Sequence, residues 1–100
     1  MPFGFVLQDE TGRTIERLGD QDGSVSRAIL NSRGSSLLSA VDPYGDTVFN
    51  HIQARILLRD WGLVEGATAS EGGRQVCADV RQLIERVARG PHLYLRFVGD

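Results

Sequence analysis

The sequence predicts an α+β domain: a small, mostly antiparallel four-stranded sheet with two main helices packed on one face, in the order ββ(α)βααβ. Three observations lead to this prediction. Near both ends of the chain lie short segments in which apolar residues alternate with other residues, as expected of strands with one buried face. A turn signal at Asp42-Pro43 precedes the longest apolar-rich helical pattern, and a second amphipathic pattern runs from Arg74 to Arg89. We therefore expect a single globular domain over residues 1–100.

The N-terminal segment predicts a β-hairpin. Residues 3–8 (FGFVLQ) alternate and are rich in residues that favour strands, and residues 13–18 (RTIERL) resume a strand-like pattern. The residues between them, Asp9 to Gly12, have the composition of a turn, in which glycine is ready to take a positive φ angle. The two segments are therefore expected to pair.

A polar loop, GDQDG, follows the hairpin. It contains Asp20 and Asp22 at a spacing that also occurs in calcium loops, but the other ligands of that pattern are missing, so the sequence favours an ordinary solvated loop. Ser24 is expected to cap a short helix over residues 25–33, with a strand as the alternative. Residues 35–41 (SSLLSAV) then predict the third strand.

The longest apolar-rich pattern in the chain lies between Val41 and Leu63. Pro43 has a fixed φ and pushes the residue before it towards an extended conformation, so a strand is expected to end there. Asp46 or Thr47 can then accept hydrogen bonds from the free N–H groups of a helix. The sequence therefore predicts a central helix that begins close to Asp46.

This predicted helix is apolar on two sides. At about 100° per residue, one side carries Val48, Phe49, Ile52, Ile56 and Leu63, and the broadly opposite side carries Ala54, Leu57, Leu58 and Trp61. Such a helix is usually sandwiched between a sheet and another layer, and we favour this internal position. The alternative is that Leu57, Leu58 and Trp61 form part of an interface, which includes the possibility of a homodimer.

The C-terminal third has the clearest local signals. Residues 64–73 are rich in small residues and are expected to form a mobile loop, in which Ser70 could cap the next helix. A continuous apolar stripe predicts a helix from Arg74 to Arg89, which Gly90-Pro91 would end. Residues 92–98 (HLYLRFV) predict a terminal strand, placed centrally beside the first strand.

Composition narrows the function classes. The net charge of −2 gives no reason to expect nucleic acid, and no apolar run approaches the ~18 residues of a membrane span. The N-terminus has no secretory signal, so a cytoplasmic location is expected. The single cysteine, Cys77, excludes an intramolecular disulfide and is expected to be a buried thiol. No cofactor or metal is predicted.

The densest polar group lies around the predicted corner and comprises Asp42, Tyr44, Asp46, Asn50 and His51. Neighbouring helical residues diverge by about 100°, so Asn50 and His51 cannot easily converge on one metal. Two carboxylates would also repel a phosphate. A well-built turn and helix cap is the favoured interpretation, and an exposed acidic and aromatic corner that recognises a protein is the second.

No known catalytic motif is found in the sequence. The alternative function is a small hydrolase-like or metal-dependent enzyme that uses His51 or His92 with Asp42 or Asp46, because histidine titrates near neutral pH. The case for nucleic-acid binding would rest on Tyr94 and Arg96 of the last strand, against the acidic net charge.

The leading hypothesis is a small standalone protein-binding domain. Its partner-binding residues would be Asp42, Tyr44, Asp46 and His51 at the corner, with Trp61 as an aromatic anchor. In its size, mild acidity and lack of a catalytic motif the chain is similar in general character to bacterial immunity proteins, which neutralise a partner toxin by docking. This resemblance implies a protein partner and no enzymatic activity.

Overall fold

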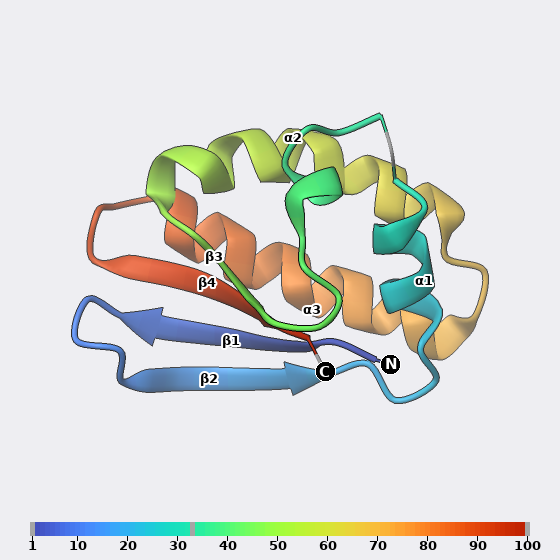
Figure 1. Cartoon of the computed structure of the whole chain (residues 1–100), viewed down its shortest axis with the longest axis horizontal. Helices are drawn as coiled ribbons and strands as arrows, with labels where there is room; N and C mark the ends of the chain where they lie inside the picture. Colours follow the sequence, from blue (N-terminus) through green and yellow to red (C-terminus); the bar gives the residue numbers. More distant parts are fainter. Residues whose placement is uncertain (1, 33, 100) are drawn as a thin grey trace.

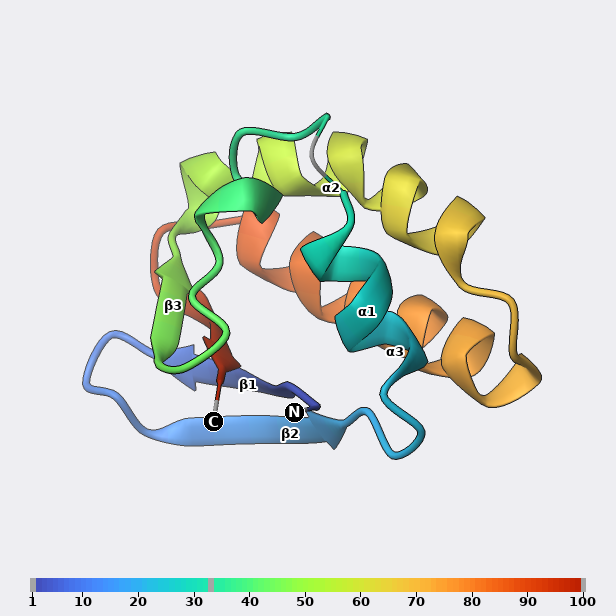
Figure 2. The same cartoon turned by 45° about the vertical axis from the view of Figure 1, so that its right-hand side comes forward.

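The computed structural model describes residues 2–32 and 34–99, which form a sheet layer and a helix layer (Figures 1 and 2). The elements are, in chain order, β1 (Gly4–Asp9), β2 (Thr14–Gly19), α1 (Ser24–Leu30), the 3₁₀ helix η1 (Leu38–Ala40), β3 (Asp46–Phe49), α2 (His51–Ala67), α3 (Glu71–Ala88) and β4 (Leu93–Val98). The four strands form one sheet in the order β2-β1-β4-β3, in which all neighbours are antiparallel. The predicted α+β fold and element order are confirmed.

The hairpin and the central terminal strand form as the sequence predicts. Gly12 has a φ of 86°, and the carboxylate of Asp9 accepts hydrogen bonds from the N–H groups of Thr11 and Arg13. In the sheet, β4 pairs with β1 so that Phe97 lies opposite Phe5. Because side chains alternate along a strand, these aromatic rings share the face that the helices cover.

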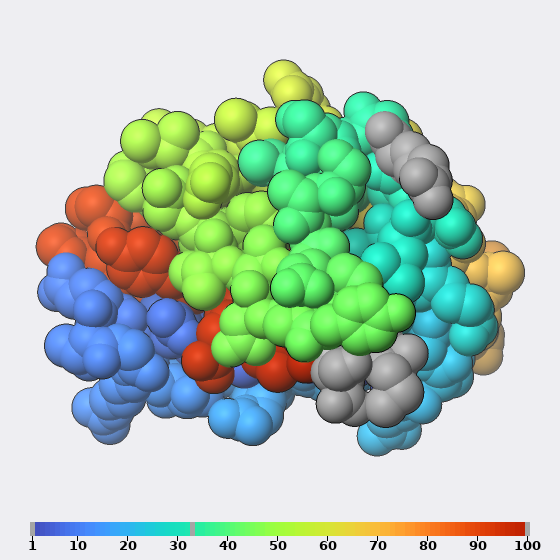
Figure 3. All heavy atoms as spheres, in the orientation of Figure 1, coloured from blue at the N-terminus to red at the C-terminus, as the bar shows by residue number. Residues whose placement is uncertain are grey.

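The third strand lies later in the chain than predicted. Residues 35–41 contain η1 instead of a strand, and the segment crosses the front of the molecule between α1 and β3 (Figure 3). The strand is Asp46–Phe49, which pairs with the outer edge of β4. Next to it, the N–H of Gly99 donates to the carbonyl of Gly45 at 2.7 Å. The outer edge of β4 therefore pairs with residues 46–49, of which Thr47, Val48 and Phe49 favour strands, and not with residues 35–41.

The start of the central helix is corrected for the same reason. Asp46 and Thr47 belong to β3, so neither caps α2. Asn50 is the cap: its side chain accepts from the N–H of Gln53, whose side chain in turn accepts from the N–H of Asn50. This reciprocal pair is a capping box, which satisfies two N–H groups at the helix start.

The predicted mobile loop is also much shorter in the structure. Helix α2 continues to Ala67, and only residues 68–70 connect it to α3. The hydroxyl of Thr68 donates to the carbonyl of Val64 at 2.7 Å and closes the last turn. Ser70 caps α3 as predicted, since its hydroxyl accepts from the N–H of Gly73.

Helix α1 forms where a helix was predicted but ends at Leu30, and residue 33 of the predicted range lies outside the described residues. Its N-cap is Gly23, with a φ of 73°, instead of Ser24. The glycine takes this left-handed conformation without the steric cost that a side chain would bring.

Trp61 lies at the centre of the core. Its side chain is 0% exposed, and its indole N–H donates to the carbonyl of Cys77 at 3.0 Å. The ring of Phe97 packs near that of Trp61, with 6.3 Å between ring centroids, and at similar distances from Phe3, Phe5 and Phe49. Cys77 is buried, as predicted, and burial raises the pKa of its thiol.

The burial of its side chains shows which of the two apolar sides of α2 faces the core. Leu57 and Trp61 are fully buried, and Leu58 packs against the core from a partly buried position. This side therefore faces α3 and the sheet and is not exposed for the homodimer interface predicted as an alternative. The favoured prediction of a helix sandwiched on both sides is therefore only half right: the side with Leu57 and Trp61 is internal, but Ile52, Ile56 and Leu63 on the other side are exposed to solvent.

Candidate functional site

The predicted acidic corner is an exposed turn, and both of its carboxylates contact other groups of the chain. Asp42 accepts a hydrogen bond from the N–H of Tyr44 at 2.8 Å. Asp46 lies 3.7 Å from the guanidinium of Arg96 on the neighbouring strand. The ring of Tyr44, which is 81% exposed, is the most accessible apolar group of this corner. Partner binding by Asp42, Tyr44 and Asp46 stays a prediction.

Two other predicted residues lie away from this corner. His51 is the first residue of α2, and residues 47–50 separate it from Asp46, most of them in the extended strand β3. Trp61 is enclosed in the core, so it is not available as the aromatic anchor predicted from the sequence. The structure therefore does not bring the predicted partner-binding residues into one patch.

The groups proposed for the alternative enzyme are not assembled either. The ring Nδ1 of His92 lies 3.0 Å from the carboxylate of Glu10, at the end of the sheet opposite the Asp42–Asp46 corner. Within residues 2–32 and 34–99, no group of three or more His, Cys, Asp or Glu side chains is placed to hold a metal ion. None of the helices in these ranges is long and apolar enough to cross a membrane.

A stripe along the outer side of α2 carries three of the large apolar side chains that are exposed among the described residues. Five of the seven large exposed apolar side chains among the described residues fall between Tyr44 and Leu63; these are Tyr44, Val48, Ile52, Ile56 and Leu63. Three of them, with Arg59, follow helical spacing on α2, and we call Ile52, Ile56, Arg59 and Leu63 the outer stripe. Ile52 is 57% exposed. Scattered apolar residues are common on surfaces, but an aligned group is typical of a binding surface.

The charges beside the outer stripe are positive. Arg59 belongs to it and Arg55 is exposed nearby, where its Nε donates to the carbonyl of Ala88. The two carboxylates of α2 are engaged within the molecule. Asp60 accepts from the hydroxyl of Ser35 at 2.7 Å and, with its other oxygen, from the Nε of Arg59 at 3.4 Å, on the edge of the outer stripe. Glu65 accepts two hydrogen bonds from one guanidinium, that of Arg81. These bonds also lower the pKa of Glu65.

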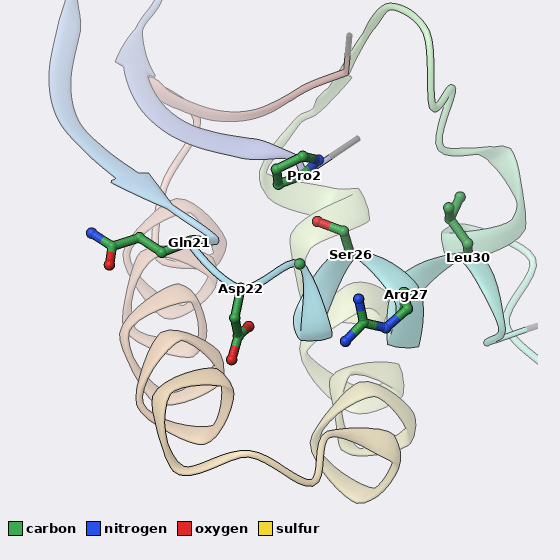
Figure 4. A pocket seen from close by; sticks show the side chains of 7 residues that line it. Pro2, Gln21, Asp22, Ser26, Arg27 and Leu30 are labelled. Atoms are coloured by element: carbon green, nitrogen blue, oxygen red, sulfur yellow. The ribbon is translucent and has the colours of Figure 1, made fainter.

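The polar end of the molecule is organised around Asp22 (Figure 4). One oxygen of its carboxylate accepts from both the N–H and the hydroxyl of Ser24, at 2.9 and 2.7 Å, and the other accepts from the hydroxyl of Ser70 at 2.8 Å. Chiefly because of the hydrogen bonds from Ser24, the pKa of Asp22 falls to about 2. Three surface hollows meet at this side chain.

Asp20 in the same loop is buried, which corrects the expectation of an ordinary solvated loop. It is only 3% exposed, and its Oδ2 accepts from the N–H and the hydroxyl of Ser26 at 2.7 and 2.5 Å. The hydroxyl of Ser26 also accepts from the N–H of Phe3, which ties α1 to the first strand. The alternation of Asp and Ser over residues 20–26 is the sequence signal for such local bonds, but only the fold adds Ser70.

Comparison with protein families, with characterised proteins and with solved structures found no match for this chain. The functional argument therefore depends on the surfaces described above. Two of them differ in chemistry: the apolar and basic outer stripe of α2, and the polar hollows around Asp22.

Proposed function

We propose that this chain is a protein-binding domain that docks on an acidic and apolar surface of a partner protein through the outer stripe of α2. One observation carries the proposal: Ile52, Ile56 and Leu63 are exposed in line on one helix, beside arginines and without an exposed, unengaged carboxylate on that helix. Burial of the exposed half of such a side chain stabilises a complex by about 1 kcal/mol.

The charge pattern determines the kind of partner. Two copies joined stripe to stripe would bring their arginines together, so like charges would oppose self-association. Carboxylates on a partner would pair with Arg55 and Arg59 around the apolar contact. An immunity or antitoxin-like inhibitor, which neutralises a partner by docking, is the particular case that we propose within this class.

Introducing negative charges into the stripe tests it directly. The full chain carries Ile52→Glu with Ile56→Glu, and a matched control carries Ala78→Glu with Gln82→Glu, at the same helical spacing on the exposed face of α3. Unfolding in urea is measured first, because both variants should stay folded. A partner captured from native host extract is then purified, and its affinity for each variant is measured at several salt concentrations.

We expect the Ile52 and Ile56 variant to bind at least about tenfold more weakly, equivalent to ~1.4 kcal/mol, while the control binds as the wild type does. Binding should also weaken as salt rises, because the arginines contribute electrostatically. Equal affinity of the two variants, or a homodimer by light scattering that the stripe variant disrupts, would overturn the proposal.

A further inference from the structure

A hollow of about 370 Å³ lies between α1 and the connection from α2 to α3. We call it the α1 hollow. Its polar lining includes Asp22, Ser24, Arg27 and Asn31 from the α1 side, and Ser70 from the connection. Ser24, Arg27 and Asn31 recur at helical spacing, so one side of α1 faces the hollow. Its volume falls within the range of small-molecule sites.

Two opposite charges line this hollow without pairing. The carboxylate of Asp22 and the guanidinium of Arg27 form no ion pair, yet the positive charge of Arg27 contributes to the lowered pKa of Asp22. The two groups are therefore close but separated. Figure 4, which is drawn at the neighbouring hollow lined by Pro2 and Ser26, shows the two side chains on either side of the first turn of α1, with the guanidinium of Arg27 directed towards Asp22.

The hydrogen bonds around Asp22 explain why its carboxylate does not pair with Arg27. Its carboxylate is held by Ser24 on one oxygen and by Ser70 on the other, so it cannot turn towards Arg27 without losing these bonds. A carboxylate has about four acceptor positions, and three are used here. One position remains for a donor. Arg27 makes no side-chain hydrogen bond to any described residue, so its donors remain available on this side of the molecule.

These charges select the ligand. A simple anion would be attracted by Arg27 but repelled by Asp22. A simple cation would be attracted by Asp22 but repelled by Arg27. A molecule with an ammonium and a carboxylate satisfies both at once. The other walls include Ala28, Ala67 and Ala69, whose small side chains leave room for a short organic body.

We infer that the α1 hollow binds a small zwitterion of the amino-acid class, with its ammonium group on Asp22 and its carboxylate on Arg27. The amide of Asn31, one helical turn beyond Arg27, supplies a further polar contact for the carboxylate end. This inference does not depend on the proposed function, because the α1 hollow and the outer stripe share no residue.

The test is an NMR titration of the isotope-labelled full chain. The probes are glycine, L-alanine, β-alanine and glycylglycine, which vary the separation of the two charges, with acetate and methylamine as the singly charged comparisons. We expect at least one zwitterion to give saturable shifts at the N–H groups of Ser24 and Ala69. Acetate and methylamine should bind at least about tenfold more weakly, because each is repelled by one of the two charges.

Arg27→Gln provides the decisive variant, because Arg27 is exposed and its replacement should leave the fold intact. It should weaken zwitterion binding at least about tenfold, whereas Arg89→Gln, an exposed change near the far end of α3, should leave it unchanged. No saturable shift with any zwitterion, equal binding of acetate or methylamine, or full binding by Arg27→Gln would overturn the inference.

Discussion

The outer stripe of α2 and the α1 hollow are both exposed, but they are built in opposite ways. The side chains of Ile52 and Ile56 are apolar and are partly exposed to solvent along one helix. Asp22 is held by Ser24 and Ser70, two residues 46 positions apart in the chain. Binding through a stripe of the first kind is favourable because a broad apolar surface is removed from water. A hollow of the second kind gains selectivity, because its charges are placed before the ligand arrives.

The largest difference should appear between the two sides of α2. Trp61→Ala removes a fully buried ring and its hydrogen bond to Cys77, so we expect the free energy of unfolding to fall by about 3–5 kcal/mol. Ile56→Ala on the outer stripe should cost less than about 1 kcal/mol, because part of its side chain is already in water. Urea denaturation of both variants measures this. Similar losses would mean that the outer stripe also supports the fold.

The packing of the polar end can be probed with two neighbouring glycines. A Cβ at Gly73 would lie 2.6 Å from the Thr68 side chain and 2.8 Å from the Ser70 hydroxyl, and it would clash with the Ser24 hydroxyl. We expect Gly73→Ala to lower the free energy of unfolding by about 1–3 kcal/mol.

Gly72→Ala is the control for this change. Its Cβ would approach only the carboxylate of Asp22, at an ordinary contact distance of 3.8 Å, so stability should change by less than about 0.5 kcal/mol. Urea denaturation is again the measurement. If both alanine variants had the same stability, the contacts among Ser24, Thr68 and Ser70 would be looser than the structure shows.

The smallest expected effect is a dependence of stability on pH. The pKa of Asp22 is about 2 in the folded chain, below its ordinary value of 3.8. The carboxylate therefore stabilises the fold above about pH 4, and this contribution is lost as the pH falls through about 2. Asp22→Asn should reduce the loss of stability across this window, as measured by urea denaturation at a series of pH values. An unchanged pH profile would contradict the hydrogen bonding assigned to Asp22.

The elements predicted correctly from the sequence have strong local signals. The β1–β2 hairpin has its turn residues and alternating strands, and α3 has a continuous apolar stripe with Ser70 as its cap. Each of these elements depends on interactions between residues a few positions apart, so the sequence pattern is enough to predict it. The same holds for β4, in which apolar and polar residues alternate along the strand, as expected when one face is buried.

The candidate site was only partly predictable because its contacts are distant in sequence. The pattern of Asp20, Asp22 and Ser24 indicates a loop with local hydrogen bonds, but nothing in it indicates that Ser70 completes the network. In the same way, the two apolar sides of α2 are visible in the sequence. Which of them faces solvent depends on where α3 and the sheet pack.

By itself, the sequence determined the fold class, the order of the elements, and the positions of the hairpin, α3 and β4, since these follow from periodicity, turns and caps. The tertiary structure alone decided that residues 46–49 form the third strand, because the outer edge of β4 pairs with them. It also placed Trp61 inside and Ile52 outside, and held Asp22 apart from Arg27. The physical reason is common to all three: each outcome is set by pairing or packing between segments that are far apart in the chain.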